Sequence, residues 1–142
     1  MTADFPQSAA RQAAPETISV VPFRGVRLHL ETDQVAVWEE HFEPKELTEA
    51  HRHTRDYLCI ALTDIDLTVE PLAGEFVEQL TVLVGADEMM IDGHRGRFPK
   101  GVIFHSRVSS EGAAHTAFNN ADVTSKLLII ELKGTGLDSK ME

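Results

Sequence analysis

The stretch HRHTRDYL spans residues 51–58 and leads directly into the apolar run YLCIAL at residues 57–62. Side chains alternate along a strand, so His51 and His53 are expected on one face, with Tyr57 and Cys59 beside them if no bulge intervenes. Two imidazoles at this spacing can share one metal ion, because zinc–imidazole bonds are about 2.0–2.1 Å long. Solvated polar residues at a strand end would show the same pattern, so this stretch alone does not decide.

A second histidine stretch, GAAHTAFN, spans residues 112–119. His115 lies 62 positions after His53 (115 minus 53) and shares an expected strand face with Ala117 and Asn119. A histidine that returns on a distant strand behind a glycine turn can close a metal site across the interior of a β-barrel. The two stretches together favour metal binding by His51, His53 and His115.

The rest of the chain predicts an all-β fold with few or no helices. Short apolar or alternating runs follow one another at about 8–12 residues, with turn residues between them, which is typical of an antiparallel sandwich or barrel. The expected strands are ISVVPF (18–23), VRLHLE (26–31), QVAVWEEHF (34–42), YLCIALT (57–63), IDLTVE (65–70), FVEQLTVLV (76–84), EMMI (88–91), GVIFHSRV (101–108), AHTAFNN (114–120) and KLLIIEL (126–132).

These runs define one predicted domain over residues 18–132. Residues 1–17 are rich in Ala, Gln and Pro without any period, so they are expected to form a flexible N-terminal arm. Residues 133–142 contain two glycines and are expected to form a flexible tail.

The composition excludes several kinds of partner and of structural site. A net charge of −10 offers no basic surface for nucleic acid, and no apolar stretch approaches the roughly 18 residues of a membrane span. The single cysteine, Cys59, excludes an internal disulfide and a cysteine-rich zinc site. The first residues lack the features of a secretory signal, so a cytoplasmic location is the expectation.

Two expected strands are apolar on both faces, namely YLCIAL (57–62) and KLLIIEL (126–132). A strand of this kind must be covered on both sides. In a short chain a second copy can supply the outer cover, so the sequence predicts a homodimer.

The two histidine stretches resemble the sequence motifs of the cupin superfamily. The first motif of that family is His-x-His with a glutamate four or five residues later, and the second ends in Gly-x-x-His-x-x-x-Asn, which Gly112, His115 and Asn119 match. The resemblance covers most of residues 18–132. It implies a jelly-roll β-barrel, usually dimeric, with a metal in the barrel mouth held by the motif histidines.

The first motif departs from the family pattern at its glutamate. Tyr57 or Leu58 occupies that position, and Asp56 comes one residue too early. The resemblance therefore implies three histidine ligands without a carboxylate, and Tyr57 is left as a fourth ligand, a hydrogen-bond donor to substrate, or a wall residue. His105 in FPKGVIFH is a rival to His115 as the third ligand.

Further residues are candidates for the surroundings of the site. Glu39, with His41 and Glu43, shares a strand face opposite Trp38 and could supply the missing carboxylate, although a solvated face has the same pattern. Residues that could lie behind the ligands are Gln79, Cys59 and Asn119.

The leading interpretation is a metal-dependent enzyme of dioxygenase type, acting on a small, anionic organic molecule. Three imidazoles suit Fe(II), the first choice, and also Zn, Ni or Cu. The oxygen chemistry rests on the family resemblance, and isomerases or lyases can use the same fold and metal ligands. The alternative is a non-catalytic module that binds a small metabolite, with a structural metal or none.

Overall fold

The computed structural model describes residues 19–20 and 25–141, so the expected arm of residues 1–17 lies outside the described residues. Within them the chain forms twelve strands and two short 3-10 helices. The strands are β1 (Ser19–Val20), β2 (Val26–Glu31), β3 (Val35–Phe42), β4 (His51–His53), β5 (Tyr57–Ala61), β6 (Ile65–Pro71), β7 (Gln79–Val84), β8 (Met90–Asp92), β9 (Arg95–Phe98), β10 (Ile103–Arg107), β11 (Ala113–Asn119) and β12 (Ser125–Leu132). The helices are η1 (Ala86–Glu88) and η2 (Gly136–Met141).

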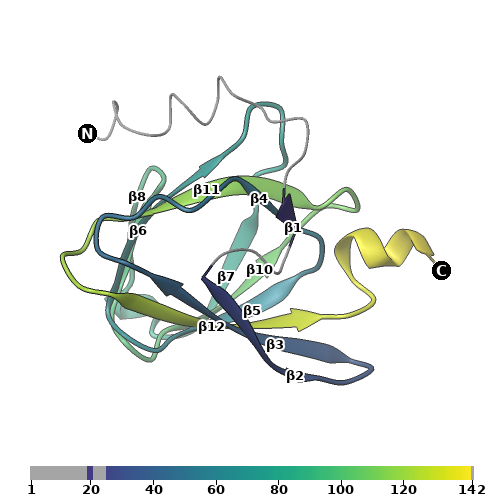
Figure 1. Ribbon diagram of the computed structural model, residues 1–142, viewed down its shortest axis with the longest axis horizontal. Helices are drawn as coiled ribbons and strands as arrows, with labels where there is room; N and C mark the ends of the chain where they lie inside the picture. Colours follow the sequence, from purple (N-terminus) through teal and green to yellow (C-terminus); the bar gives the residue numbers. More distant parts are fainter. Residues whose placement is uncertain (1–18, 21–24, 142) are drawn as a thin grey trace.

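The strands form two six-stranded sheets that face each other (Figure 1). The first has the order β1-β4-β11-β6-β9-β8, and the second has the order β2-β3-β12-β5-β10-β7. All pairings between these strands are antiparallel except the short β1–β4 pair. This is the all-β arrangement that the strand spacing predicts, in the jelly-roll form that the cupin resemblance implies.

The core fills the space between the two sheets. Its members are apolar side chains at alternate positions of their strands, as period-two patterning requires. The cluster consists of Phe42, Tyr57, Cys59, Ala61, Ile65, Leu67, Phe98, Val102, Phe104, Ala117, Leu127 and Ile129.

The chain changes sheets between His53 and Tyr57. β4 pairs with β11 in the first sheet, whereas β5 pairs with β10 and β12 in the second. The expected continuous strand is therefore two strands joined by a three-residue crossing. Both nevertheless turn their odd-numbered residues into the interior, because the burial pattern of β4 and of β5 alternates in phase.

Gly112 explains why a glycine precedes the β11 histidine. β11 lies directly against β4, with Ala113 opposite His53. Gly112 has φ +82°, and a Cβ atom built on it would lie 2.8 Å from the carbonyl oxygen of His53. A larger residue would be strained there and would push the two histidine strands apart.

Three local features differ from the sequence-based expectations. β9 was not among the expected strands, because its residues RGRF carry too few apolar side chains to form an apolar or alternating run. The expected strand at 76–84 begins only at Gln79, so Glu78 lies in the preceding loop. Residues 136–141 of the expected tail form η2, which Arg55 contacts through Asp138 with an Nε–Oδ2 distance of 2.7 Å. The flexibility of the tail stays a prediction.

The outer face of the second sheet carries a group of half-buried apolar residues. Leu58 lies opposite Ile130, and Ile60 lies opposite Leu128, all on the side away from the core. This is the two-faced character on which the predicted homodimer rests, and the dimer itself stays a prediction. None of the helices among the described residues has the length and apolar character needed to cross a membrane.

Candidate metal centre

Three histidine side chains converge inside the barrel. His51 and His53 come from β4, and His115 comes from β11, whose register places it directly opposite His51. Their ring centroids are 4.7–5.0 Å apart, and one ring nitrogen of each lies within 4.8 Å of the others. The sequence-predicted ligand set is therefore brought together. All three side chains are buried.

Burial keeps these imidazoles neutral. It is the main cause that lowers the pKa of His51 to about 3 and that of His115 to about 4. Burial also holds the pKa of His53 well below its usual value, with the neighbouring histidines adding to the effect. Nδ1 of His51 lies 2.9 Å from the carbonyl oxygen of Glu49, which fixes the orientation of the ring. Neutral imidazoles are the form that binds metal ions.

A carboxyl group that the sequence analysis did not select lies beside the histidines. Glu78 accepts hydrogen bonds at Oε1 from the Tyr57 hydroxyl at 2.6 Å and from the Ser106 hydroxyl at 2.8 Å. Its Oε2 lies 3.5 Å from Nδ1 of His115. Burial raises the pKa of Glu78 to about 7, although the two hydrogen bonds act in the opposite direction. The loop before β7 thus places a carboxyl group beside the histidines. The first motif lacks its usual glutamate, and Glu78 provides such a group from a different part of the chain.

Two polar atoms beside the cluster have no hydrogen-bond partner among the described residues. Nδ1 of His53 and Oε2 of Glu78 are buried and form no hydrogen bond within the described chain. Buried polar atoms are normally satisfied, so each such exception calls for an explanation. Neutral imidazole nitrogens together with a carboxylate oxygen form a donor set for divalent transition metals. The residues present therefore fit a bound metal ion.

Tyr57 lies against the cluster as a hydrogen-bond donor. Its ring stacks on His53 with centroids 4.5 Å apart, and its hydroxyl donates to Glu78. Burial is the largest cause that raises the pKa of Tyr57 well above its usual value, so the phenol keeps its proton. This disfavours the interpretation of Tyr57 as an anionic fourth ligand. The predicted hydrogen bond from Tyr57 to a substrate stays a prediction.

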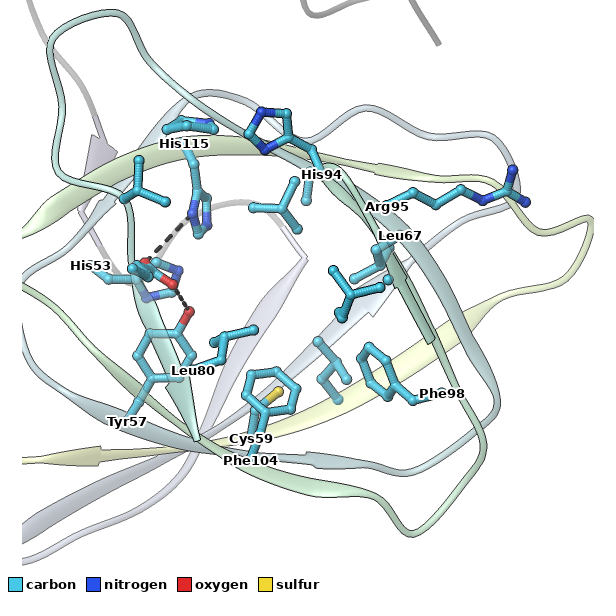
Figure 2. Close-up of a pocket in the computed structure, with 18 of the residues that line it drawn as sticks. His53, Tyr57, Cys59, Leu67, Leu80, His94, Arg95, Phe98, Phe104 and His115 are labelled. Atoms are coloured by element: carbon cyan, nitrogen blue, oxygen red, sulfur yellow. Dashed lines mark hydrogen bonds and ion pairs between the residues drawn. The ribbon is translucent and has the colours of Figure 1, made fainter. Parts of the chain in front are cut away.

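A cavity of about 230 Å³ extends from the histidines into the barrel. In Figure 2, His53, His115 and Tyr57 lie together at one end, while Leu67 and Phe98 lie toward the other. Most of the wall is apolar and includes Phe42, Leu67, Val69, Phe76, Phe98 and Phe104. A ligand in this cavity would meet polar groups at the histidine end and hydrocarbon along most of its length.

Four further polar side chains line the same cavity, namely Cys59, Glu40, His94 and Arg95. Cys59 is buried, and burial is the main cause that raises its thiol pKa well above the usual value, so it is an unreactive thiol. Glu40 projects inward from β3 and is only 4% exposed. Burial raises the pKa of Glu40 to about 8, and the nearby Glu46 and Glu78 add to the rise. The sequence analysis predicted Cys59 at this position but not Glu40.

Three predicted candidates lie outside the cavity. Glu39 is on the outer face of β3, where it contacts His29 and His41, so it does not supply the missing carboxylate. Gln79 is exposed on β7, and its neighbour Glu78 faces inward instead. His105 is the outward residue of β10, 4.0 Å from Asp56, so His115 rather than His105 faces the cluster. In each case the alternation of side chains along the strand turns this residue to the face away from the cavity.

Asn119 holds a turn behind the cavity. Its buried amide donates to the carbonyl oxygens of Phe42, Glu43 and Val123, and its carbonyl oxygen accepts from the backbone of Ala121 at 3.0 Å. These bonds tie the end of β11 to the end of β3. The motif asparagine therefore supports the fold near the site and does not face the cluster.

The inward position of Glu40 had a signal in the sequence, whereas that of Glu78 had none. Alternation in AVWEEHF places Glu40 on the face of Trp38 and Phe42, which is the apolar face. Glu78 precedes β7, and the direction of a loop side chain does not follow from alternation.

Comparisons with known proteins support the fold. A cupin domain from Bordetella pertussis Tohama I is 24% identical, with a TM-score of 0.55 over 76% of this chain and 91% of that one. KdgF from a Halomonas species is 14% identical, with a TM-score of 0.47 over 78% and 81% of the two chains. A cupin superfamily protein from Desulfitobacterium hafniense DCB-2 is 13% identical, with a TM-score of 0.45 over 75% and 74%.

No protein-family model and no curated protein matches the sequence. The fold assignment therefore rests on the Bordetella pertussis structure together with the two sheets described above. The chain has the cupin fold, which confirms the fold implied by the resemblance of its two histidine stretches to the cupin motifs.

Proposed function

We propose that this chain binds one divalent transition metal through His51, His53 and His115 and uses it to act on a small organic molecule. One observation carries the proposal. Three buried imidazoles, kept neutral by their surroundings, present one nitrogen each within 4.8 Å of the others at the end of a cavity. Isolated core histidines do not require such convergence.

Iron(II) is the first choice of metal, and zinc, nickel or copper also suit the donor set. When bound, the metal would supply Lewis acidity or oxygen activation at the mouth of the cavity. Dioxygenase-type chemistry is the proposed reaction, and its support is the resemblance of the two histidine stretches to the cupin motifs. Isomerase or lyase chemistry is the next choice, because the cupin fold hosts many activities.

The walls indicate the kind of substrate. Tyr57 and Glu78 lie beside the histidines, Glu40, His94 and Arg95 are further polar residues of the wall, and the remaining surface is largely hydrocarbon. An anionic, oxygen-bearing head beside the metal and an apolar body along the wall would satisfy both parts. Tyr57 would orient the head by donating a hydrogen bond, and Glu78 would hold or accept a proton at Oε2.

A non-catalytic binding module is the second candidate. Its support is that the motif glutamate is replaced by Tyr57, a residue that keeps its proton in this site. In that case the cavity would capture a small metabolite, and the metal would be structural or unnecessary.

The first experiment is elemental analysis of untagged protein, in wild type and in the variants His51→Ala, His115→Ala and His29→Ala. We expect near-stoichiometric metal in the wild type and in His29→Ala, whose ring lies on the outer face. We expect both inner variants to lose the metal, because each removes one of three donors. Wild-type protein without metal after anaerobic reconstitution would contradict the proposal.

Oxygen consumption separates the two candidate functions. An oxygen electrode trace that depends on Fe(II) in the presence of small organic acids would support the enzyme. Ligand binding that survives metal removal, without oxygen uptake, would support the binding module.

A homodimer and a cytoplasmic location belong to the same proposal. The outer apolar residues Leu58, Ile60, Leu128 and Ile130 support the dimer, since a second copy would cover them. Light scattering on a dilution series should give a dimer mass, and a monomer at micromolar concentration would contradict it. The cytoplasmic location rests on the sequence alone.

A further inference from the structure

Glu40 is a buried acid with no hydrogen-bond partner among the described residues. It lies on the inner face of β3, lines the histidine cavity and is 4% exposed. Burial is the largest cause that raises the pKa of its carboxyl group, and the neighbouring acids Glu46 and Glu78 add to the rise. The three histidines are in the first sheet, so Glu40 faces the cavity from the opposite sheet.

Glu131 offers an internal comparison. It is also buried on the inner face of the same sheet, at 3% exposure. Its carboxylate, however, accepts a hydrogen bond from the Trp38 indole at 2.9 Å and contacts Arg55 at 3.4 Å. Glu131 is thus a satisfied structural acid, and it does not line the cavity. An unpaired buried carboxyl costs folding free energy that an apolar residue would not.

The strand register separates Glu40 from the metal end of the cavity. Glu40 lies opposite Leu127, which in turn lies opposite Ala61 of β5. Tyr57, which stacks on His53, is four residues earlier on β5. At about 3.3 Å per residue, roughly 13 Å of strand separates the row of backbone positions Glu40, Leu127 and Ala61 from the row that contains Tyr57. Side chains from both rows line the same cavity, and Glu78, which contacts His115, is near enough to Glu40 to raise its pKa. A small ligand bound by one end at the histidines can therefore reach Glu40 with its other end.

We infer that Glu40 is a second polar subsite, which donates its carboxylic O–H to an acceptor oxygen at the far end of the substrate. This inference rests on the proposed function, in which the near end binds at the histidine cluster. The raised pKa of Glu40, about 8, supports it because the neutral acid can donate. The substrate class is then a bifunctional molecule with a metal-binding oxyanion head, an apolar linker and a terminal carbonyl or ether oxygen.

The test uses matched pairs of 2-oxo acids of graded chain length, with and without a ketone oxygen near the far end. Their dissociation constants are measured by calorimetry on zinc-loaded wild type, Glu40→Met, Glu40→Gln and Glu39→Gln. Glu39 is the control because it is the adjacent residue on the outer face. Zinc content is measured on the same samples.

At the best chain length, the far ketone should strengthen binding to wild type and to Glu39→Gln by about 3- to 10-fold, as expected for one neutral hydrogen bond. The gain should vanish in Glu40→Met and persist in part in Glu40→Gln, which keeps an N–H donor. Zinc content should be the same in all four proteins. The inference is overturned if the gain is equal in wild type and Glu40→Met, or absent from wild type at every length. Loss of zinc from the wild type would instead contradict the proposed function.

Discussion

Glu39 and Glu40 are adjacent in the sequence and have opposite surroundings. Glu39 lies on the outer face of β3 between His29 and His41, and their hydrogen bonds lower its pKa to about 2. Glu40 points into the cavity without a donor, and burial raises its pKa to about 8. The same chemical group is an anion on one face of the sheet and a neutral acid on the other. Strand parity alone makes the difference.

Glu78 and Gln79, at the start of β7, are a second pair of adjacent residues with opposite surroundings. Glu78 contacts Tyr57, Ser106 and His115, whereas Gln79 is exposed to solvent. A polar residue in this barrel is therefore a site residue only if its backbone turns it inward. Substitutions in these neighbouring pairs test the contrast directly.

The largest expected effect is on the pH dependence of folding in metal-free protein. A carboxyl whose folded pKa exceeds its unfolded value binds its proton more tightly in the folded state, so stability falls as pH rises between the two values. For Glu40 this window runs from 4.5 to about 8. Glu40→Gln should gain stability relative to wild type across it, by at most about 1.4 kcal/mol per pH unit.

Urea denaturation at a series of pH values measures this difference. The comparison with wild type cancels the contributions of the three histidines, which are present in both proteins. Glu39→Gln should show no gain between pH 4.5 and 8, because the low pKa of Glu39 keeps this acid ionised throughout. Parallel curves for wild type and Glu40→Gln would show that Glu40 is solvated or paired.

The next effect concerns a buried polar group that does have partners. Asn119→Ala removes an amide that donates to three carbonyl oxygens. Leaving such acceptors unsatisfied should lower the free energy of unfolding by roughly 1–3 kcal/mol. Thermal unfolding measures it, and metal affinity in the folded variant should stay close to wild type. Lost affinity with full stability would instead place Asn119 in the metal site.

The smallest of the three effects is on metal affinity. Glu78→Gln keeps the shape of the side chain and removes its charge, so the zinc affinity should fall by about 10- to 100-fold, the usual cost of losing a carboxylate beside metal ligands. Competition with a chromophoric chelator measures this. Gln79→Ala is the matched control and should bind zinc as wild type does. Equal affinities for Glu78→Gln and wild type would exclude Glu78 from the site.

Much of the fold and the histidine set could be predicted from the sequence. Strand alternation placed His51, His53, Tyr57 and Cys59 on a common face, and the resemblance of the stretch around His115 to the second cupin motif favoured it over His105. The prediction for Tyr57 and Cys59 assumed one continuous strand. It succeeded because the crossing at residues 54–56 preserves the phase of the alternation.

The acidic residues of the cavity differ in how far the sequence indicates them. Alternation places Glu40 on the apolar face of β3 with Trp38 and Phe42, although Glu39 of the opposite face was selected for the site. Glu78 depends on the course of residues 72–78, a loop whose side-chain directions are set by tertiary contacts with Tyr57 and Ser106. Strand periodicity carries no information about such contacts.

The pairing of His115 with His51 has a consequence for the order of events during synthesis. The two residues are 64 positions apart (115 minus 51), and their strands meet only when β11 docks beside β4. A chain still emerging from the ribosome holds two of the three imidazoles and lacks the third. The proposed metal would therefore find its complete ligand set only after assembly of the first sheet, and its binding would then stabilise the folded chain.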